Sequence, residues 1–221
     1  MDVSELYRPS VADLVPQMTD AERAAWLAQR CGKLTASRMR DAMDFKRDGS
    51  PTMKRSDYMR DLLAERLTQM TTRHYMTPAM EWGLAAEPEA KLAYMHATGI
   101  TLHPSTFYDH PRIDMCGATP DAEIADGGLA EIKAPTTGVY LEWFLAGVVP
   151  EIHKPQMILQ CAATGRRWVE FIAFDPRIKD DKRRLFVRRF VPSAEEIAHV
   201  EASAIKFLSE LDAMWEAFTT S

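Results

Sequence analysis

The chain has 221 residues, of which 46% are hydrophobic and 27% charged, proportions that are ordinary for a globular protein with a buried core. It contains no apolar run near the roughly 18 residues that a membrane span requires, and its first residues, MDVSELYRPS, lack the apolar centre of a secretion signal. The net charge of −5 counts against a protein that holds nucleic acid by overall positive charge, and three well-separated cysteines favour reduced thiols in a cytoplasmic protein.

The first hundred residues predict four helices and one loop, over about 20–31, 35–43, 56–68 and 77–98 for the helices and 44–55 for the loop. Thr19 with Glu22 has the pattern of a capping box, and Ser56 is the expected cap of the third helix. Pro88 lies inside the fourth helix. Because proline lacks a backbone N–H and disfavours helical geometry at the preceding residue, we expect a kink or break at 86–88.

The middle of the chain changes to short segments bounded by turns, which predict strands over 105–109, 113–118, 121–125 and 129–133. Helices over 136–146 and 153–164, strands over 167–174 and 184–191, and a final helix to about 218 follow, the last with a capping box at Ser193 and Glu196. This order predicts a mixed α/β fold, a single domain over 1–221 in which helices flank a central mixed sheet.

Acidic and basic side chains gather on the expected hairpin, as Pro120-Asp121 before one strand and Glu131-Ile132-Lys133 on the next. Alternate side chains of a strand share a face, so Glu131 and Lys133 point to one side and Ile132 to the other. We expect Ile132 to be buried, which leaves a carboxylate and an amine together on one face.

The length of the turn decides whether Asp121 joins them. A two-residue Gly-Gly turn sends Asp121 to the opposite face, whereas a three-residue Asp-Gly-Gly turn pairs it with Lys133 on the same face. The glycines suit the three-residue turn, which needs a residue in the left-handed region. The same register sets Glu123 opposite Glu131, a like-charge pair that requires a cation or a local twist.

The oxygen ligands of this cluster suit a hard cation, Mg²⁺ or in its place Mn²⁺, held by Asp121, Glu131 and the backbone carbonyl of Ile132. Lys133 can orient or help to deprotonate an attacking water and offset charge on a phosphate. Glu87, at the expected kink, is a candidate to assist a second metal or to position water. A Glu-x-Lys pair alone is more often a surface pair, but the complete pattern favours a nuclease.

The ordered motifs resemble the restriction-endonuclease-like superfamily and, more narrowly, the lambda exonuclease or YqaJ-type viral recombinase family. The resemblance is carried by Arg30, Leu34–Ser37, Trp82-Gly83, Glu87, Thr119–Asp121, Glu131–Lys133, Gln156 and Phe174–Arg177. It implies a restriction-endonuclease-like core and a 5′→3′ exonuclease that degrades one strand of duplex DNA from its ends and leaves 3′ overhangs for recombination. It also implies a homotrimeric ring, Mg²⁺, a partner single-strand annealing protein, and a phage or prophage protein acting in the bacterial cytoplasm.

The resemblance assigns roles to individual positions. It implies catalytic or metal-binding roles for Asp121, Glu131, Ile132, Lys133 and Glu87, a 5′-phosphate pocket, and contacts to the duplex. The phosphate pocket is formed by Arg30, Ser37 and Thr119, and the DNA contacts by Arg47, Met80 and Gln156, with Met80 as a wedge at the terminal base pair. Without the resemblance, Arg30 and Arg47 are interpreted as surface charges and Met80 as a core residue.

The sequence departs from the family pattern at His153 and Ile158, where a tyrosine and a second glutamine are expected. A histidine near the start of a helix is most often a surface residue, although His153 can also contact phosphate or water. Two other functions stay open: a structure-specific endonuclease with the same metal core, and a non-catalytic DNA-binding module of the same fold.

Overall fold

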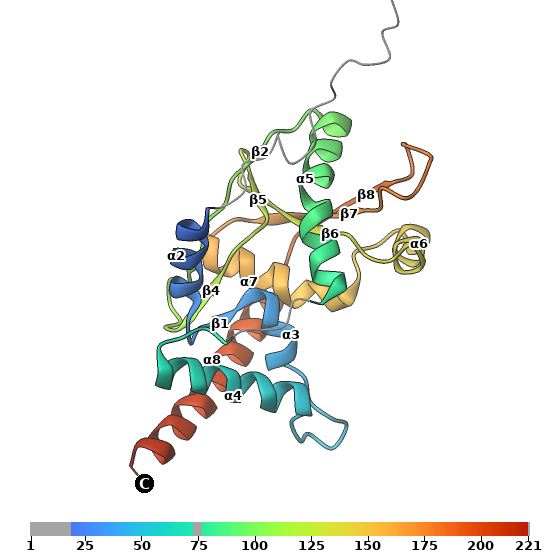
Figure 1. Ribbon diagram of the computed structural model, residues 1–221. Helices are drawn as coiled ribbons and strands as arrows, with labels where there is room; N and C mark the ends of the chain where they lie inside the picture. Colours follow the sequence, from blue (N-terminus) through green and yellow to red (C-terminus); the bar gives the residue numbers. More distant parts are fainter. Residues whose placement is uncertain (1–18, 73–76, 221) are drawn as a thin grey trace, which may run out of the picture.

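The computed structural model describes residues 19–72 and 77–220 as helices packed around two sheets (Figure 1). The helices are α2 (Asp20–Arg30), η2 (Ala36–Arg38), α3 (Met39–Ala42), α4 (Met53–Thr68), α5 (Pro78–Thr98), α6 (Thr137–Ala146), η3 (Glu151–His153), α7 (Lys154–Thr164) and α8 (Ala194–Thr219). The strands are β1 (Leu34–Thr35), β2 (Leu102–His103), β3 (Tyr108–Asp109), β4 (Cys116–Ala118), β5 (Ala122–Ile124), β6 (Gly128–Lys133), β7 (Trp168–Phe174) and β8 (Leu185–Phe190). The predicted mixed α/β fold, with a mixed sheet flanked by helices, is confirmed.

The larger sheet has five strands in the order β2-β5-β6-β7-β8. Its central strands β6 and β7 are parallel, and the chain crosses between them through α6 and α7. The other neighbouring strands of this sheet pair antiparallel. The smaller sheet has the order β1-β4-β3 and carries the segment that leads into β5.

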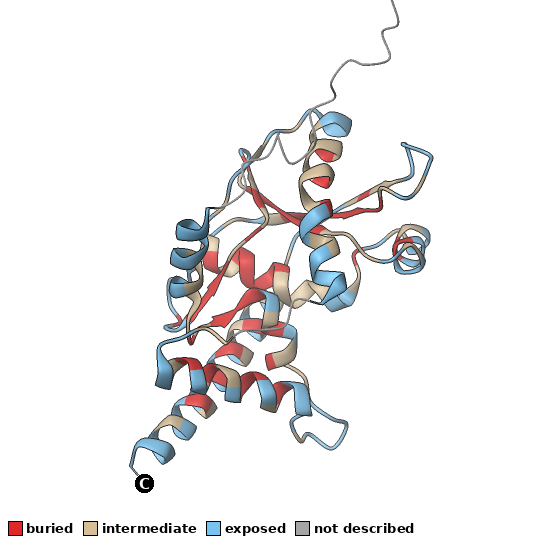
Figure 2. Ribbon diagram, in the orientation of Figure 1, coloured by how far each residue is buried: buried red, intermediate tan, exposed pale blue. Residues whose placement is uncertain are grey.

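Two apolar cores lie on opposite faces of the central strands. One face of β6 and β7, with Leu129 and Phe171, packs in the larger core together with Met157 and Leu159 of α7. The other face packs against α5 in a smaller core built from Ala90, Tyr94, Ala130, Ile132 and Ile172. Buried residues accordingly concentrate in the central strands and on the inward side of α7 (Figure 2). Because alternate residues of β6 face different helices, its odd-numbered residues are directed to the α7 side.

The helix ends follow the sequence signals with two exceptions. Both capping boxes and the left-handed glycines at Gly99 and Gly165 are confirmed. However, α4 begins at Met53, because the Thr52 hydroxyl accepts the Arg55 N–H at 3.3 Å, so Ser56 is not its cap. Of the kink or break expected at 86–88, the break is wrong.

Helix α5 continues through Pro88 over its whole length. Pro88 lacks the backbone N–H that would otherwise donate a hydrogen bond to the carbonyl of Leu84, four residues earlier. Leu84 is 55% exposed, so this turn of α5 lies at the surface, and the helix accommodates the proline. Among helices of 19–72 and 77–220, none has the combination of length and apolar character that crossing a membrane requires.

The hairpin between β5 and β6 has an odd-length turn, as predicted, but a different register. Ile124 pairs with Gly128 and Ala122 with Ala130, so the next step along the strands places Asp121 across from Glu131 instead of Lys133. The predicted opposition of Glu123 and Glu131 is wrong, and Glu123 instead bonds to Arg166 and Tyr108.

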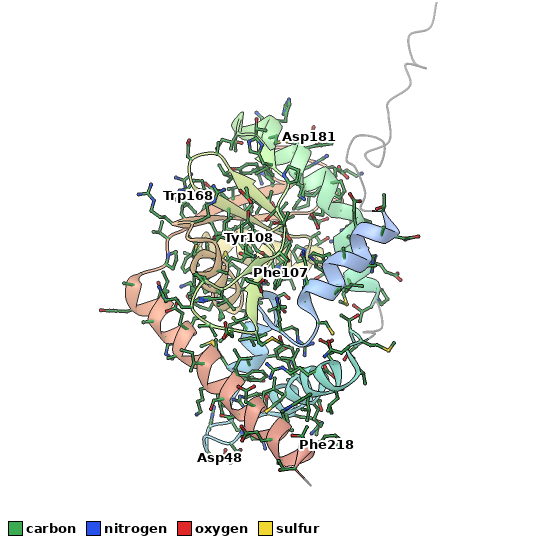
Figure 3. The ribbon with its side chains drawn as sticks, turned by 90° about the vertical axis from the view of Figure 1, so that its left-hand side faces the viewer. Asp48, Phe107, Tyr108, Trp168, Asp181 and Phe218 are labelled. Atoms are coloured by element: carbon green, nitrogen blue, oxygen red, sulfur yellow. The ribbon has the colours of Figure 1, made fainter. Side chains whose placement is uncertain are left out.

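The register follows from the packing of Trp168. A Cβ atom on Gly128 would lie 2.2 Å from the Trp168 ring, so the indole occupies the space that a side chain would need. Gly128 therefore belongs to the strand, and Gly127, with φ of 83°, supplies the left-handed residue of the turn. Trp168 and Tyr108 lie on the side of the molecule that faces the viewer in Figure 3.

The turn makes a testable prediction for Gly127→Ala. A side chain in the left-handed region costs about 1–2 kcal/mol, so the free energy of unfolding in urea should fall by about that amount. Gly138→Ala is the matched control, since Gly138 lies in α6 with no atom within 4 Å of an added Cβ. In a helix this change should raise stability by roughly 0.5–1 kcal/mol. Equal effects of the two substitutions would contradict the assigned turn.

Candidate active site

A pocket of about 500 Å³ opens where the carboxyl end of β6 meets α2, η2, α5 and α7. All the predicted site residues except Arg47 line it, namely Arg30, Ser37, Met80, Glu87, Thr119, Asp121, Glu131, Ile132, Lys133 and Gln156. Residues separated by more than a hundred positions therefore share one cavity. Arg47 is exposed on the loop between α3 and α4, which extends to the end of the molecule marked by Asp48, opposite the loop of Asp181 (Figure 3).

The β5–β6 hairpin supplies the acidic centre of the pocket. Asp121 lies just before β5, and one of its carboxylate oxygens accepts the Ile132 N–H at 2.6 Å. Withdrawal from water, and then the nearby carboxylates of Glu131 and Glu87, raise the pKa of Asp121 well above its ordinary value. The Asp121 carboxyl is therefore both withdrawn from water and close to two other carboxylates.

Glu131 is completely buried, and both its oxygens have partners. Oε1 accepts a hydrogen bond from the Lys133 ammonium, and Oε2 accepts one from the Gln160 amide at 2.6 Å. Gln160 is absent from the residues predicted from sequence. The available signal is its spacing, because Gln156 and Gln160 are four residues apart and so share one face of α7.

Lys133 lies between the acidic centre and Gln156, with its Nζ 3.4 Å from the Gln156 Oε1. Withdrawal from water alone would lower its pKa, but the carboxylates of Glu131 and Asp121 outweigh this effect and the net shift is upward. Lys133 is thus an ammonium at neutral pH in this arrangement. That charge state suits orienting a water or offsetting phosphate charge, and does not suit proton abstraction.

The donor set fits a hard divalent cation. The carboxylates of Asp121 and Glu131 and the backbone at Ile132 offer only oxygen ligands at the pocket, the type that Mg²⁺ prefers. Burial raises the pKa of Asp121 most, and the carboxylates of Glu131 and Glu87 raise it further, against the opposing effect of the Lys133 ammonium. Within 19–72 and 77–220, however, no three His, Cys, Asp or Glu side chains form a ready-made cluster. Glu131 would have to share or release its contact with Lys133 to bind a cation.

A second corner of the pocket is built around Arg30 and Trp26, both on α2. The Arg30 guanidinium lies over the Trp26 ring, 4.0 Å from its centre, and the Trp26 indole N–H donates to the Thr119 hydroxyl at 3.1 Å. Arg30 forms no ion pair with any residue in the described part of the chain. Stacking thus orients the guanidinium while leaving its N–H donors available. Trp26 is a site residue that the sequence prediction omitted, although its i, i+4 spacing with Arg30 was visible.

Ser37 and Met80 complete the rim. Ser37 is exposed, with its hydroxyl 3.4 Å from that of Thr35. Met80 is 51% exposed on the first turn of α5, so the alternative of core packing is wrong for this residue.

Comparison with known proteins identifies the family. A family model described as a YqaJ-like viral recombinase domain matches residues 25–167, which is more than half of the chain. The chain belongs to this family. No curated protein matches the sequence.

Two solved structures support the family assignment at the level of the fold and the sequence. An alkaline exonuclease, LHK-Exo, from Laribacter hongkongensis is 34% identical, with a TM-score of 0.81 over 89% of this chain and 96% of that one. A structure of LHK-Exo in complex with dAMP gives 35% identity and the same TM-score and coverage. A phage-related exonuclease from Haemophilus somnus 129PT, 13% identical with a TM-score of 0.58 over 82% of this chain and 96% of that one, shares the fold. The YqaJ-like family and the similarity to LHK-Exo support a nuclease.

Of the two departures from the expected family pattern, one lies in the apolar core and the other in an aromatic cluster. Ile158 is 5% exposed and packs in the larger core. His153 is partly buried between Trp143 and Phe171, with ring centres 5.1 and 5.4 Å away. The expectation that His153 is a surface residue is therefore wrong, and its ring serves as part of an aromatic cluster beside the pocket.

The Phe174–Arg177 motif holds in place the segment that follows β6. Asp175 is fully buried and accepts hydrogen bonds from the Thr137 hydroxyl at 2.7 Å and from Arg177 at 2.6 Å. Arg177 also donates to the Pro135 carbonyl at 2.8 Å and covers the Trp82 ring at 4.8 Å. These contacts tie the segment after Lys133 to α5, whose residues line the pocket on the other side.

His153 gives the YqaJ-like domain a predictable pH dependence. Burial, with the nearby charges of Lys133 and Arg40, lowers the pKa of His153 to about 3. The unfolded chain binds this proton near pH 6.5, whereas the folded protein binds it only near pH 3, so the contribution to stability is complete above pH 6.5 and declines as the pH falls.

We therefore expect His153→Phe, which keeps an aromatic ring in place, to reduce the acid sensitivity of folding. Between about pH 7 and pH 5 the wild type should lose about 1–2 kcal/mol more than the variant, measured by urea unfolding. His199→Phe on the exposed side of α8 is the control and should retain the wild-type slope. Parallel curves for the wild type and His153→Phe would contradict the neutral state of His153.

Proposed function

We propose that this protein is a Mg²⁺-dependent exonuclease that digests one strand of duplex DNA from its ends in the 5′→3′ direction and leaves 3′ overhangs for recombination. One observation carries the proposal: the acidic centre of Asp121 and Glu131, the Lys133 ammonium and the Arg30 corner line the same pocket. Membership of the YqaJ-like viral recombinase family and similarity to an alkaline exonuclease support it.

The pocket offers a separate group for each part of phosphodiester hydrolysis. Asp121, Glu131 and the Ile132 carbonyl would hold the divalent ion, which stabilises charge on a phosphoryl oxygen and lowers the pKa of a bound water. Lys133 stays protonated and faces the same space, so it can position the water and offset phosphate charge. Glu87 lies at the pocket wall in an ion pair with Lys91 at 2.7 Å and would assist at the edge of the site.

The Arg30 corner favours an exonuclease over an endonuclease. A guanidinium that stacks on Trp26 and makes no ion pair in the described residues presents a fork of donors, which suits a phosphate with free oxygens. The hydroxyls of Ser37 and Thr119 add donors at the same rim. A terminal 5′ phosphate bound there would fix the distance from the DNA end to the acidic centre. Met80 and Gln156, which line the same pocket, are placed to contact the terminal nucleotides.

Basic residues outside the pocket provide a route for the duplex. Within 19–72 and 77–220, four cations near the loop between α3 and α4 have no ion-pair partner: Arg40, Lys46, Arg47 and Lys54. Such side chains suit the phosphate backbone, and contacts of that kind confer little sequence preference. A homotrimeric ring with these cations inside would reconcile a basic DNA path with the net charge of −5. A single-strand annealing protein that receives the overhang would be the partner.

Digestion of end-labelled linear duplex tests this proposal. With Mg²⁺ the wild type should release label from the 5′ end first, whereas omission of Mg²⁺ should stop the reaction and a covalently closed circle should stay intact. Lys133→Ala should lower the rate by at least about 10²–10³-fold, the usual effect of removing one group that stabilises transition-state charge, with DNA binding retained. Lys182→Ala, on the exposed loop between β7 and β8, is the matched control.

Three results would contradict the proposed reaction. Cleavage of the closed circle would indicate an endonuclease. Wild-type activity of Lys133→Ala would remove Lys133 from the mechanism, and absence of hydrolysis by the wild type under all conditions would indicate a non-catalytic DNA-binding module.

The Arg30 corner predicts a preference for a 5′ phosphate. The wild type should cut a 5′-phosphorylated duplex faster than a 5′-hydroxyl duplex, and Arg30→Ala should reduce that preference by roughly 10- to 100-fold, the worth of charge-assisted hydrogen bonds. Arg23→Ala is the control, because Arg23 is exposed on the same helix and does not line the pocket. If the wild type cuts both substrates equally, Arg30, Ser37 and Thr119 do not form a phosphate site.

A further inference from the structure

Gln160 is a fully buried amide on the side of α7 that faces the sheet. Its helical neighbours Met157, Leu159 and Cys161 are buried and pack in the apolar core. Burying an amide in such surroundings costs free energy unless its hydrogen bonds are made. Gln160 makes a bond of 2.6 Å from Nε2 to Glu131 Oε2, while its own Oε1 has no partner. Half of the amide is therefore unsatisfied, which is a poor arrangement for stability alone.

The bond sets the orientation of the Glu131 carboxylate. The terminal torsion of a glutamate is broad, so a carboxylate without fixed partners can rotate. Gln160 holds Oε2 on the α7 side, which leaves Oε1 as the oxygen that contacts Lys133. Without the amide, Lys133 would be the remaining side-chain partner of Glu131 among the described residues. Both carboxylate oxygens could then turn toward the ammonium.

Gln160 acts from behind the site and not within it. Gln156 lines the pocket and lies near Lys133, whereas Gln160, one helical turn further along, does not line the pocket. A substrate in the pocket would meet Glu131 and Gln156, and Glu131 would separate it from Gln160. Any effect of Gln160 on the reaction must therefore pass through the Glu131 carboxylate.

We infer that Gln160 is a positioning residue that holds Glu131 in the orientation needed to bind a divalent cation and thereby sets the affinity of the site for Mg²⁺. This inference rests on the proposed function, in which Glu131 is a metal ligand. Hydrogen bonds to ligating carboxylates preorganise metal sites, and their loss typically weakens metal binding by roughly 10–100-fold. Once the cation is bound, Glu131 is already oriented, so Gln160 contributes little to the chemical step.

The test measures metal affinity apart from catalysis. Mg²⁺ is titrated into the full-length wild type, Gln160→Met and Gln160→Leu by calorimetry without DNA, and the Mg²⁺-dependent rise in melting temperature is recorded in parallel. Both substitutions remove the donor and also the unsatisfied Oε1, so the variants should stay folded. We expect Mg²⁺ binding to weaken by roughly 10–100-fold. The Mg²⁺ concentration for half-maximal nuclease rate should rise equally, with the rate at saturating Mg²⁺ within a few-fold of wild type.

Cys161→Ala is the matched control, since Cys161 is the next residue of α7, is 3% exposed and packs in the larger apolar core, whereas the side-chain hydrogen bonds of Glu131 in the described residues come from Lys133 and Gln160. It should lower the melting temperature while leaving Mg²⁺ affinity unchanged. Unchanged or tighter Mg²⁺ binding in both Gln160 variants would overturn the inference, as would equal weakening in Cys161→Ala. A wild type that binds no Mg²⁺ would instead reject the proposed function and the inference with it, so the two failures are distinguishable.

Discussion

A carboxylate that is completely buried in a protein needs hydrogen-bond or ion-pair partners, and Glu131 is such a carboxylate. One of its oxygens accepts a hydrogen bond from Lys133 and the other accepts one from Gln160. Removing either partner would leave this buried carboxylate with a single side-chain partner among the described residues. The arrangement therefore requires β6 and α7 to keep a fixed separation, and the apolar core between them, with Leu129, Met157 and Phe171, maintains it.

The same constraint explains why the pocket lies where it does. Strand β6 is the central strand, so its odd-numbered residues face α7 while its even-numbered residues pack against α5. Only near its carboxyl end does the chain leave the core, and there Lys133 is partly exposed, while the buried Glu131 lines the pocket beside Asp121. Helices α2 and α5 then bring Arg30 and Glu87 to this opening. The interaction of Asp175 and Arg177 with Pro135 holds the exit from β6 in place.

Local pattern was enough to predict the α/β order, the capping boxes and the grouping of Glu131 with Lys133, because each depends on short-range periodicity or on a motif, whereas the Arg30 corner and the DNA-contacting residues came from the family resemblance. The register of the hairpin was not predictable in this way. It depends on Trp168 packing over Gly128, a contact across forty positions. Gln160 and Trp26 were missed for a similar reason, since their importance comes from Glu131 and from Thr119, which lie on other elements. His153 and Ile158 were assessed against the family's sequence pattern, which carries no information on their surroundings. These are an aromatic cluster for His153 and the apolar core for Ile158.

The charge state of Lys133 constrains any reaction in this pocket. Because the surrounding carboxylates keep it protonated, a proton leaving an attacking water has to go to another acceptor or to solvent. Asp121 and Glu87 are other carboxylates of the pocket. However, Asp121 already accepts a hydrogen bond from the Ile132 N–H, and Glu87 forms an ion pair with Lys91. An ammonium in contact with Glu131 also competes with any cation for the same oxygen. Binding of a cation by Glu131 would therefore be coupled to release of Lys133 toward the pocket, where Gln156, with its Oε1 3.4 Å from the Lys133 Nζ, would be the neutral acceptor for the ammonium.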